Sequence, residues 1–422
     1  MADRHWVWIT AGFLALALVA SACGAPGATS PASNPDNGPA ETQAPSPTDT
    51  DSSAAEPEGS SAGDCEDPFG EGTPPFPTRY WDKTNFCKHD IDYSSLMSGG
   101  PPPDGIPAID EPKFESFEAG DKWLGPEWPV MAYEHDGDAR AYPLAILIWH
   151  EIANDTVGGQ PVALTFCPLC NSTIAFSRIA PDGQELDFGT TGLLRHSDLV
   201  MYDRQTESFW QQITGEAIVG HYTGEQLEFL PSQILAWQDF KSEYPDGQVL
   251  SRETGHPRSY GQNPYGGYDD PDSRPFLFRG FPDDRLPPKE RVVGIELEDE
   301  AVVYPFSDLQ EVKVVNDEFA GESIVVFWAP GVKSSLDSGQ MQNSRDVGTA
   351  AVYNRTVEGQ TLTFEDAGDN QFRDQETGST WNLVGEAVSG PLEGAQLEKI
   401  VHGQHFWFAW AAFLPDSEVR TP

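Results

Sequence analysis

Residues 165–176, TFCPLCNSTIAF, place a cysteine-containing turn between two segments of β-type sequence. The flanking segments PVALTFC (161–167) and STIAFSR (172–178) are alternating or β-branched, a pattern that predicts a β-hairpin. The turn carries Cys167 and Cys170 with a proline between them. The stretch therefore predicts a strand–turn–strand unit that holds two sulfurs close together.

The sequence around this hairpin occurs twice along the chain. AYPLAILIWHEIAND (141–155) matches VYPFSDLQEVKVVND (303–317) at an offset of 162, and GEAIVG (215–220) matches GEAVSG (385–390). A period of this length indicates tandem domains rather than a solenoid of short repeats. Further matched pairs are Asp203 with Asp374, Thr206 with Thr377, Ser208 with Ser379, Trp210 with Trp381, Leu227 with Leu397, Trp237 with Trp407 and Pro245 with Pro415.

The cysteine turn is the part that the second copy lacks. FCPLC becomes FWAPG, so Trp328 and Gly331 stand where the first copy has its cysteines, and Val312 stands in the place of His150. Residues kept by both copies, such as Asp203 and Trp210, are best explained by the fold. Residues that only the first copy keeps are the candidates for chemistry.

The order of the segments predicts a β-rich α+β fold made of two homologous tandem domains. Helices are expected at Pro231 to Glu243 and in HGQHFWFAWAAF (402–413), with His402 and His405 on one face of the second helix. The predicted organisation is a signal peptide at 1–23, a linker at 24–64, an N-terminal extension at 65–124, a first domain at 125–256, a connector at 257–290 and a second domain at 291–422.

The first residues of the chain predict export. An apolar run from Trp6 to Val19 follows Arg4 and His5 and is too short for a membrane span, which is typical of a signal peptide. VASAC resembles a bacterial lipobox, which makes Cys23 the expected site of acylation and of attachment to a membrane. Because Ala20 stands where the lipobox usually has leucine, simple secretion is the alternative.

Residues 24–64 consist of Pro, Ser, Thr, Ala, Gly, Asp and Glu with a few Asn and Gln, and contain no Lys, Arg or aromatic residue. Such a segment cannot form a core, so it is expected to be a disordered tether. The formal net charge of the chain is -42, which excludes nucleic acid and anionic lipid surfaces as favourable partners. No EF-hand spacing accompanies the acidic residues, so solvation explains them better than calcium binding.

Two further cysteines, Cys65 and Cys87, flank a short Pro-rich and aromatic segment without metal-ligand spacing. In an exported protein this arrangement predicts a disulfide bond. In the chain-entropy treatment, closing a loop of about 23 residues stabilises the fold by about 3 kcal/mol.

Three interpretations compete for Cys167 and Cys170. The first is a metal site, since a CPxC turn between strands resembles the knuckle of zinc ribbons. His150 is the preferred third ligand, with His196 and His221 as alternatives, and the expected metal is zinc or copper.

The second interpretation is thiol–disulfide chemistry, with Cys167 as nucleophile and Cys170 as resolving thiol. NSTIAF is a poor helix start, so the helix dipole that lowers the pKa of many redox cysteines is not expected here. The third interpretation is a structural disulfide or a buried reduced pair, with His150 a buried histidine without a ligand role.

Residues 258–268, RSYGQNPYGGY, have no match in the second copy. Arg258, Tyr260 and Tyr265 could line a pocket near the cysteines, although an ordered connector held by tyrosines is the favoured explanation. The chain contains no GxSxG, P-loop or HExxH motif, so the sequence does not identify a reaction.

Taken together, TFCPLCNSTIAF, TGLLRHSDLVMYDRQTESFWQQ (191–212), GEAIVG and RSYGQNPYGGY resemble the prokaryotic domain-of-unknown-function family 3179 over most of residues 125–305. The resemblance implies an exported protein or lipoprotein and implies no particular reaction. Within it, Cys167 and Cys170 belong to the family's cysteine element, and His150 falls in an LxxHExxND-like stretch.

The sequence as a whole predicts a cell-envelope lipoprotein with a Cys-Cys-His metal site, used in metal handling or metal-dependent chemistry. The alternatives are a thiol–disulfide oxidoreductase and a non-catalytic envelope binding module. The sequence names neither a substrate nor a protein partner.

Overall fold

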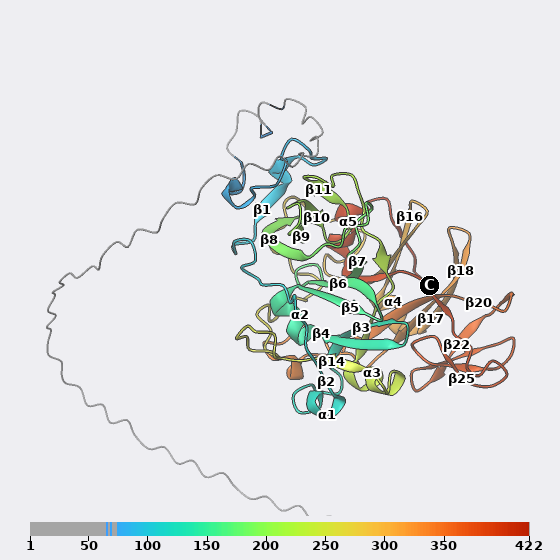
Figure 1. The fold of residues 1–422 in the computed structure, drawn as a ribbon. Helices are drawn as coiled ribbons and strands as arrows, with labels where there is room; N and C mark the ends of the chain where they lie inside the picture. The colour runs from blue at the N-terminus through green and yellow to red at the C-terminus, as the bar shows by residue number, and fades with distance from the viewer. Residues whose placement is uncertain (1–64, 66–67, 70–73, 422) are drawn as a thin grey trace, which may run out of the picture. The chain divides into compact units, whose positions relative to one another are not determined.

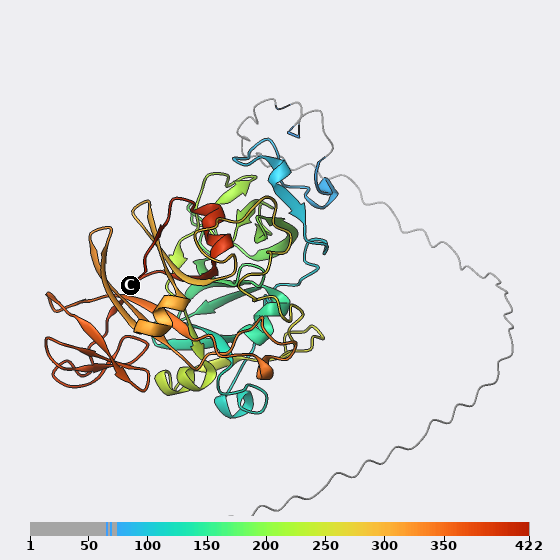
Figure 2. The same cartoon turned by 180° about the vertical axis from the view of Figure 1, so that it is seen from behind.

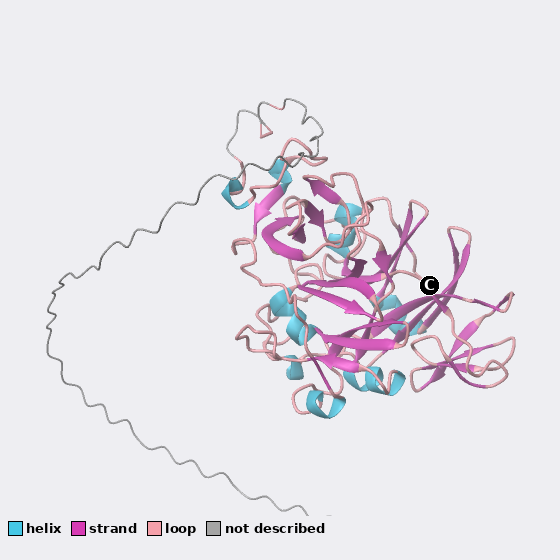
Figure 3. Ribbon diagram, viewed as in Figure 1, coloured by secondary structure: helices cyan, strands magenta, loops and turns pink. Residues whose placement is uncertain are grey.

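The structure is a computed structural model that describes Cys65, residues 68–69 and residues 74–421. These residues belong to one compact unit at 62–422. Strands dominate it and its helices are short (Figures 1 and 3), which confirms the predicted β-rich class. None of the described helices is long and apolar enough to cross a membrane.

The features predicted for the N-terminus lie outside the described residues. These are the signal peptide at 1–23, the acylated Cys23 and the tether at 24–64.

The half that contains the cysteines is built from three sheets. Their orders are β13-β3-β4-β14-β2, β12-β7-β6-β5 and β1-β8-β9-β10-β11. The predicted hairpin is confirmed as β6 and β7, which pair from Val162 with Ser177 to Cys167 with Ser172. The strands are β1 (Leu96–Ser98), β2 (Phe114–Glu115), β3 (Pro129–His135), β4 (Asp138–Pro143), β5 (Ile152–Val157), β6 (Gln160–Cys167), β7 (Ser172–Ser177), β8 (Phe188–Arg195), β9 (Asp198–Asp203), β10 (Phe209–Gln211), β11 (Ala217–Val219), β12 (Phe229–Leu230), β13 (Gln233–Ala236) and β14 (Gln248–Leu250).

The other half has three sheets of four strands, β27-β15-β16-β28, β17-β18-β19-β26 and β22-β23-β24-β25, and a separate pair β20-β21. Its strands are β15 (Arg291–Leu297), β16 (Glu300–Pro305), β17 (Val314–Phe319), β18 (Glu322–Ala329), β19 (Thr349–Asn354), β20 (Thr356–Val357), β21 (Gln360–Thr361), β22 (Phe364–Gly368), β23 (Gln371–Asp374), β24 (Thr380–Trp381), β25 (Ala387–Ser389), β26 (Glu398–Lys399), β27 (Gly403–Phe406) and β28 (Glu418–Val419).

Corresponding sheets of the two halves pair their strands in the same way. In the first half, β13 pairs antiparallel with β3 and β14 pairs parallel with β4. In the other half, β27 pairs antiparallel with β15 and β28 pairs parallel with β16. Each hairpin leads into a short helix, α2 (Leu144–His150) or α4 (Phe306–Val312). The residue after each helix, Glu151 or Lys313, has a positive φ, of 60° and 64° respectively.

A buried aspartate organises the same turn in each half. The Asp203 carboxylate accepts hydrogen bonds from the Thr206 and Ser208 amides and from Trp210 Nε1. Asp374 accepts the equivalent bonds from Thr377, Ser379 and Trp381. Buried donors need partners, so these matched residues serve the fold, as their repetition predicts.

Backbone hydrogen bonds show which residue of the half without cysteines occupies the position of Cys167. Phe166 N donates to Glu151 O, and Trp328 N donates to Lys313 O. Cys167 then pairs with Ser172 as Ala329 pairs with Thr349. Ala329, and not Trp328, therefore occupies the place of Cys167, one residue away from the position expected from the sequence motif.

Both predicted helices begin later than expected. In the first, Gln233–Ala236 pairs with β3, and only α3 (Trp237–Glu243) is helical. In the second, His405 lies within β27, His402 precedes it, and α5 begins at Trp407 and ends at Phe413. The expectation that the two histidines share a helix face is wrong, because pairing with a neighbouring strand overrides the local helical spacing.

Two of the hydrophobic clusters contain buried residues from both halves. The cluster around the cysteines includes Val332, Phe406 and Phe408 from the other half. α5 lies beside the β8–β9 hairpin (Figures 1 and 2), where the Phe413 ring contacts the His196 ring. The predicted division into two domains with a connector at 257–290 stays a prediction.

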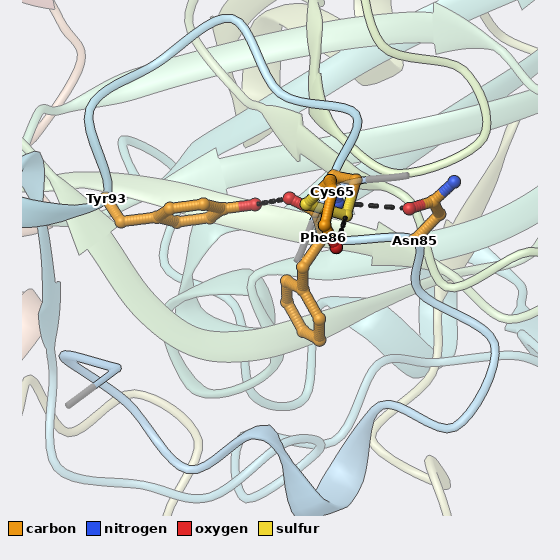
Figure 4. Close-up of a disulfide and its surroundings, with 5 residues drawn as sticks. Cys65, Asn85, Phe86 and Tyr93 are labelled. Atoms are coloured by element: carbon orange, nitrogen blue, oxygen red, sulfur yellow. Dashed lines mark hydrogen bonds between the residues drawn. A yellow bond between two sulfur atoms is a disulfide. The ribbon is translucent and has the colours of Figure 1, made fainter. Parts of the chain in front are cut away.

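The N-terminal extension is fastened to the β1–β11 sheet. The predicted disulfide between Cys65 and Cys87 is confirmed, with 5.8 Å between the Cα atoms. Figure 4 shows it beside the hydrogen bonds from Cys87 N to Asn85 Oδ1 and from the Tyr93 hydroxyl to Phe86 O. Aromatic residues of the extension, including Trp81, pack on Phe209 of the sheet.

Candidate metal centre

The cysteine element is a tight turn between β6 and β7. Cys167 is the last residue of β6, and Cys170 N donates to Cys167 O at 3.2 Å. Asn171 completes the turn with φ of 49°, a left-handed conformation that asparagine tolerates better than most residues. Both thiols are free and buried.

Asp198 brings a carboxylate to the two sulfurs. One ligand atom from each of Cys167, Cys170 and Asp198 lies within 4.8 Å of the other two, and the exposed fractions of the residues are 2%, 0% and 0%. Asp198 is the first residue of β9, and the turn before it has positive φ at His196 and Ser197. Two such residues form the two-residue hairpin turn that matches the twist of β-strands. This turn sets Asp198 against the cysteines.

The Asp198 carboxylate is held in place on one side only. Oδ2 accepts hydrogen bonds from Gln211 Nε2 at 2.6 Å and from Ile213 N at 3.0 Å. Oδ1 is buried and accepts no N–H or O–H hydrogen bond from the described residues, so the neighbouring Cys167 and Cys170 thiols are its only donors there. Thiols are weak donors, and a metal ion is a stronger partner for a buried carboxylate oxygen.

Burial disfavours the charged form of every acid at this site. Burial raises the pKa of Asp198 to about 6, although bonds from Gln211 and Ile213 oppose the shift. Burial, together with the negative charges of Asp198 and Glu151, raises the pKa of Cys167, and burial raises that of Cys170 well above its ordinary value. The carboxylate charges that act on these thiols are negative, so a cation bound beside the sulfurs would favour their thiolate forms.

Glu151 adds a second carboxyl group beside the centre. It follows α2, it is 8% exposed, and Phe166 N donates to its backbone oxygen. Burial, followed by the charge of Asp198, raises its pKa to about 8. At the corresponding position of the other half stands Lys313, whose ammonium lies 3.7 Å from the centroid of the Trp328 ring.

His150, the expected third ligand, is buried but engaged elsewhere. Its Nδ1 lies 2.7 Å from Pro107 O, and its Nε2 lies 2.7 Å from the Tyr260 hydroxyl. A carbonyl oxygen only accepts, so Nδ1 carries the proton and Nε2 accepts from Tyr260. The group of ligand atoms around the sulfurs contains Asp198 and does not contain His150. The structure thus groups Asp198, and not the expected His150, with the two sulfurs as residues that could hold a metal.

The alternative histidines also lie outside the group. The His196 ring packs on Phe413, and the His221 ring packs on Tyr222.

Three hydrogen bonds hold the cysteine turn from outside its own half. Phe406 N donates to Cys170 O at 2.8 Å, and the Tyr268 hydroxyl donates to Leu169 O at 3.1 Å. Arg291 Nη1 donates to Asn171 Oδ1 at 2.7 Å. The half without cysteines and the connector therefore form one wall of the site.

The connector tyrosines pack close to the cysteine element and to His150. Tyr260 bonds to His150, and the pKa of Tyr265 is raised by burial and by the nearby charges of Glu151 and Cys167. Arg258 is exposed.

The model of a protein family described as "Protein of unknown function (DUF3179)" matches residues 103–417. The chain belongs to the DUF3179 family. The match extends through both halves, further than the sequence motifs alone suggested. No curated protein and no solved structure matches the chain.

In this DUF3179 chain, the sequence motifs located the two sulfurs but missed Asp198 and Glu151. One signal for Asp198 is the length of the hairpin that carries it. β8 and β9 pair from Phe188 with Asp203 to Arg195 with Asp198, whereas the corresponding β22 and β23 are shorter. Asp198 lies at the tip of this extension, which only the first half has.

Proposed function

We propose that this DUF3179 protein is a zinc-binding protein of the cell envelope, with Cys167, Cys170 and Asp198 as ligands. The observation that carries the proposal is the convergence of these three buried side chains within 4.8 Å. Asp198 Oδ1 accepts no N–H or O–H hydrogen bond from the described residues, so it could serve as the third ligand atom once the two thiols have lost their protons. Glu151 lies outside this group of ligand atoms, but it is close enough for its charge to act on Cys167.

The mixture of ligands favours zinc over copper. Thiolates suit both zinc and Cu(I), while a carboxylate oxygen is a hard ligand that Cu(I) binds poorly. Zinc accepts sulfur and oxygen together in tetrahedral sites. When bound, zinc would hold both sulfurs as thiolates and act as a Lewis acid, and Gln211 and Ile213 would keep the carboxylate oriented.

Metal binding explains the site better than thiol–disulfide exchange does. The first cysteine of a redox pair needs a lowered pKa and access to its partner. Here both thiols are buried with raised pKa values, and the turn joins two strands instead of starting a helix. Because the ligands are buried, the proposed role is to hold zinc rather than to open it to a substrate.

Two wider features belong to the same proposal. Acylation at Cys23 would attach the protein to a membrane outside the cytoplasm. The tether at 24–64 would then let the folded unit lie at a distance from the membrane surface. Duplication of one ancestral unit would explain why the half without cysteines has kept its sheets and its Asp–Trp turn. That half now supports the cysteine turn through Phe406 and Arg291.

Zinc content and affinity of purified protein test the proposal. We expect one zinc per chain in the wild-type protein, and loss of high-affinity binding in Cys167→Ser, Cys170→Ser and Asp198→Ala. His150→Gln is the matched control, because His150 is a buried histidine near the site that would not touch the metal. Equal zinc content in wild-type and Cys167→Ser protein would refute the centre, and loss of zinc only in His150→Gln would restore the original ligand set.

A further inference from the structure

A cavity of about 390 Å³ lies where the two halves meet, and it adjoins the cysteine site through Ile213, whose amide donates to Asp198. One wall comes from β7 and β12 of the first half, and the other from β15, β27 and α5 of the second. Its volume falls within the range of small-molecule pockets. The apolar residues that matter most are Ile174, Ile213, Phe229, Leu230 and Trp410.

A pair of glycines gives this cavity its aromatic wall. Gly294 and Gly403 are direct partners across β15 and β27. A Cβ at Gly294 would lie 2.5 Å from the Trp410 ring, and one at Gly403 would lie 2.1 Å from His405 Nε2. Any larger residue would displace these rings. The glycines therefore let Trp410 and His405 lie directly against the strands.

The chain contains a corresponding junction that is filled. There β3 and β13 of the first half meet β19 and β26 of the second, and the cavity between them measures only about 10 Å³. Ala132 and Gln233 pair across those strands where the open junction has its glycines. The Tyr353 hydroxyl lies 3.4 Å from Gln233 Oε1 and helps to fill the space.

The filled junction also contains a cation that the open junction lacks. Lys399, which pairs with Tyr353 in β19, reaches across to Glu134 with 3.8 Å between Nζ and Oε2. At the open junction Phe229 pairs with Phe176 in the equivalent place. Glu134 and Glu296 are each the sixth residue of their strands, β3 and β15. The open junction thus keeps the glutamate and has lost the lysine.

Glu296 forms no ion pair within the described part of the chain. Glu298 and Asp299 line the same cavity, and none of its lining residues is a lysine or arginine. Glu296 is exposed at the cavity rim, where partial desolvation, and then the charges of Glu216 and Asp299, raise its pKa. An apolar cavity whose rim carries acidic side chains and no basic ones is complementary to a cation that carries an apolar tail.

We propose that this cavity binds a primary alkylamine. Its ammonium group pairs with Glu296 as Lys399 pairs with Glu134, and its alkyl chain lies against Phe229, Leu230 and Trp410. The proposal does not depend on the zinc site.

Isothermal titration calorimetry with hexylammonium chloride tests the proposal on the full chain. Hexanol and hexanoate have the same tail and differ in the head group, so they are the matched controls. We expect hexylammonium to bind at submillimolar to millimolar concentration, with about fivefold weaker binding in Glu296→Gln, the upper range for a partly exposed ion pair. Equal binding of hexanol, or undiminished binding to Glu296→Gln, would overturn the proposal.

Phe229→Lys is a second variant that recreates the filled junction. Its lysine is expected to pair with Glu296 and to abolish hexylammonium binding. If this variant fails to fold, as judged by circular dichroism, Glu296→Gln remains decisive, because it changes an exposed side chain only. Ethylammonium, which has the same single charge and a shorter tail, separates the two parts of the ligand: binding as tight as that of hexylammonium would refute the apolar contribution.

Discussion

Replacing Asp198 by asparagine separates its role as a ligand from its role in the fold. Asparagine keeps one side-chain oxygen, which can still accept the hydrogen bonds from Gln211 Nε2 and Ile213 N. The variant loses the negative oxygen that would bind the metal. We therefore expect Asp198→Asn to remain folded in chelator and to lose most of the stabilisation that zinc gives the wild-type protein.

The size of the effect follows from binding linkage and from the size of the folded unit. Zinc at 100 times its Kd stabilises the folded state by about 2.7 kcal/mol. About 360 residues in one unit, at about 2.1 cal/mol/K per residue, give an unfolding entropy of about 0.8 kcal/mol per degree. The wild-type Tm should thus rise by about 3 to 4 °C. Loss of a ligand weakens binding by about 100-fold or more, which reduces the shift to about half a degree.

Differential scanning calorimetry in chelator and in buffered zinc measures both shifts. Asp203→Asn is the matched control, since Asp203 is equally buried and hydrogen-bonded but is not among the ligand atoms near the sulfurs. It should lower the Tm in both buffers and keep the full zinc-dependent increment. A zinc shift in Asp198→Asn as large as that of the wild-type protein would refute the assignment of Asp198 as a ligand.

Three further predictions address the rest of the molecule. Burial, with Glu386 and Asp239, raises the pKa of Glu243 to about 7 from an ordinary value of 4.5. The folded state therefore binds more protons than the unfolded state between about pH 4.5 and 7, so the unfolding free energy falls as the pH rises through this window. Glu243→Gln should reduce this fall, measured as the difference in unfolding free energy between urea titrations at pH 5 and pH 8. An unchanged difference would show that Glu243 does not cause it. Replacing Cys65 and Cys87 together by serine should lower the unfolding free energy by about 3 kcal/mol and leave zinc content unchanged, so a loss of zinc would contradict the separation of the two sites. Asp374→Ala leaves several buried donors unpaired and should cost about 3 kcal/mol or more, measured by denaturant unfolding, whereas a cost below about 1 kcal/mol would show that water replaces the carboxylate.

Local patterns in the sequence predicted the parts of the fold that depend on neighbouring residues. Alternation identified the β6–β7 hairpin, and repetition identified the Asp203 and Asp374 turns as structural. The helix expected from Pro231 starts at Trp237, because Ile234 and Leu235 are paired with β3. These two residues have helical spacing, but they pair with a strand that lies about 100 positions earlier in the chain. Local spacing carries no information about that contact.

The position of Asp198 beside the sulfurs was missed for the same reason. His150 was favoured because it disappears together with the cysteines, but its two ring nitrogens join α2 to Pro107 and Tyr260. Its loss in the other half is explained by the loss of these contacts. Asp198 reaches the sulfurs only through the turn at His196 and Ser197 and the register of β8 with β9. A single sequence does not reveal which hairpin tip faces the cysteine turn.

X-ray absorption at the zinc K-edge, on protein loaded with one zinc per chain, tests the proposed centre most directly. The account predicts two sulfur neighbours at about 2.3 Å together with oxygen neighbours at about 2.0 to 2.2 Å. A first shell that contains only nitrogen and oxygen would contradict it.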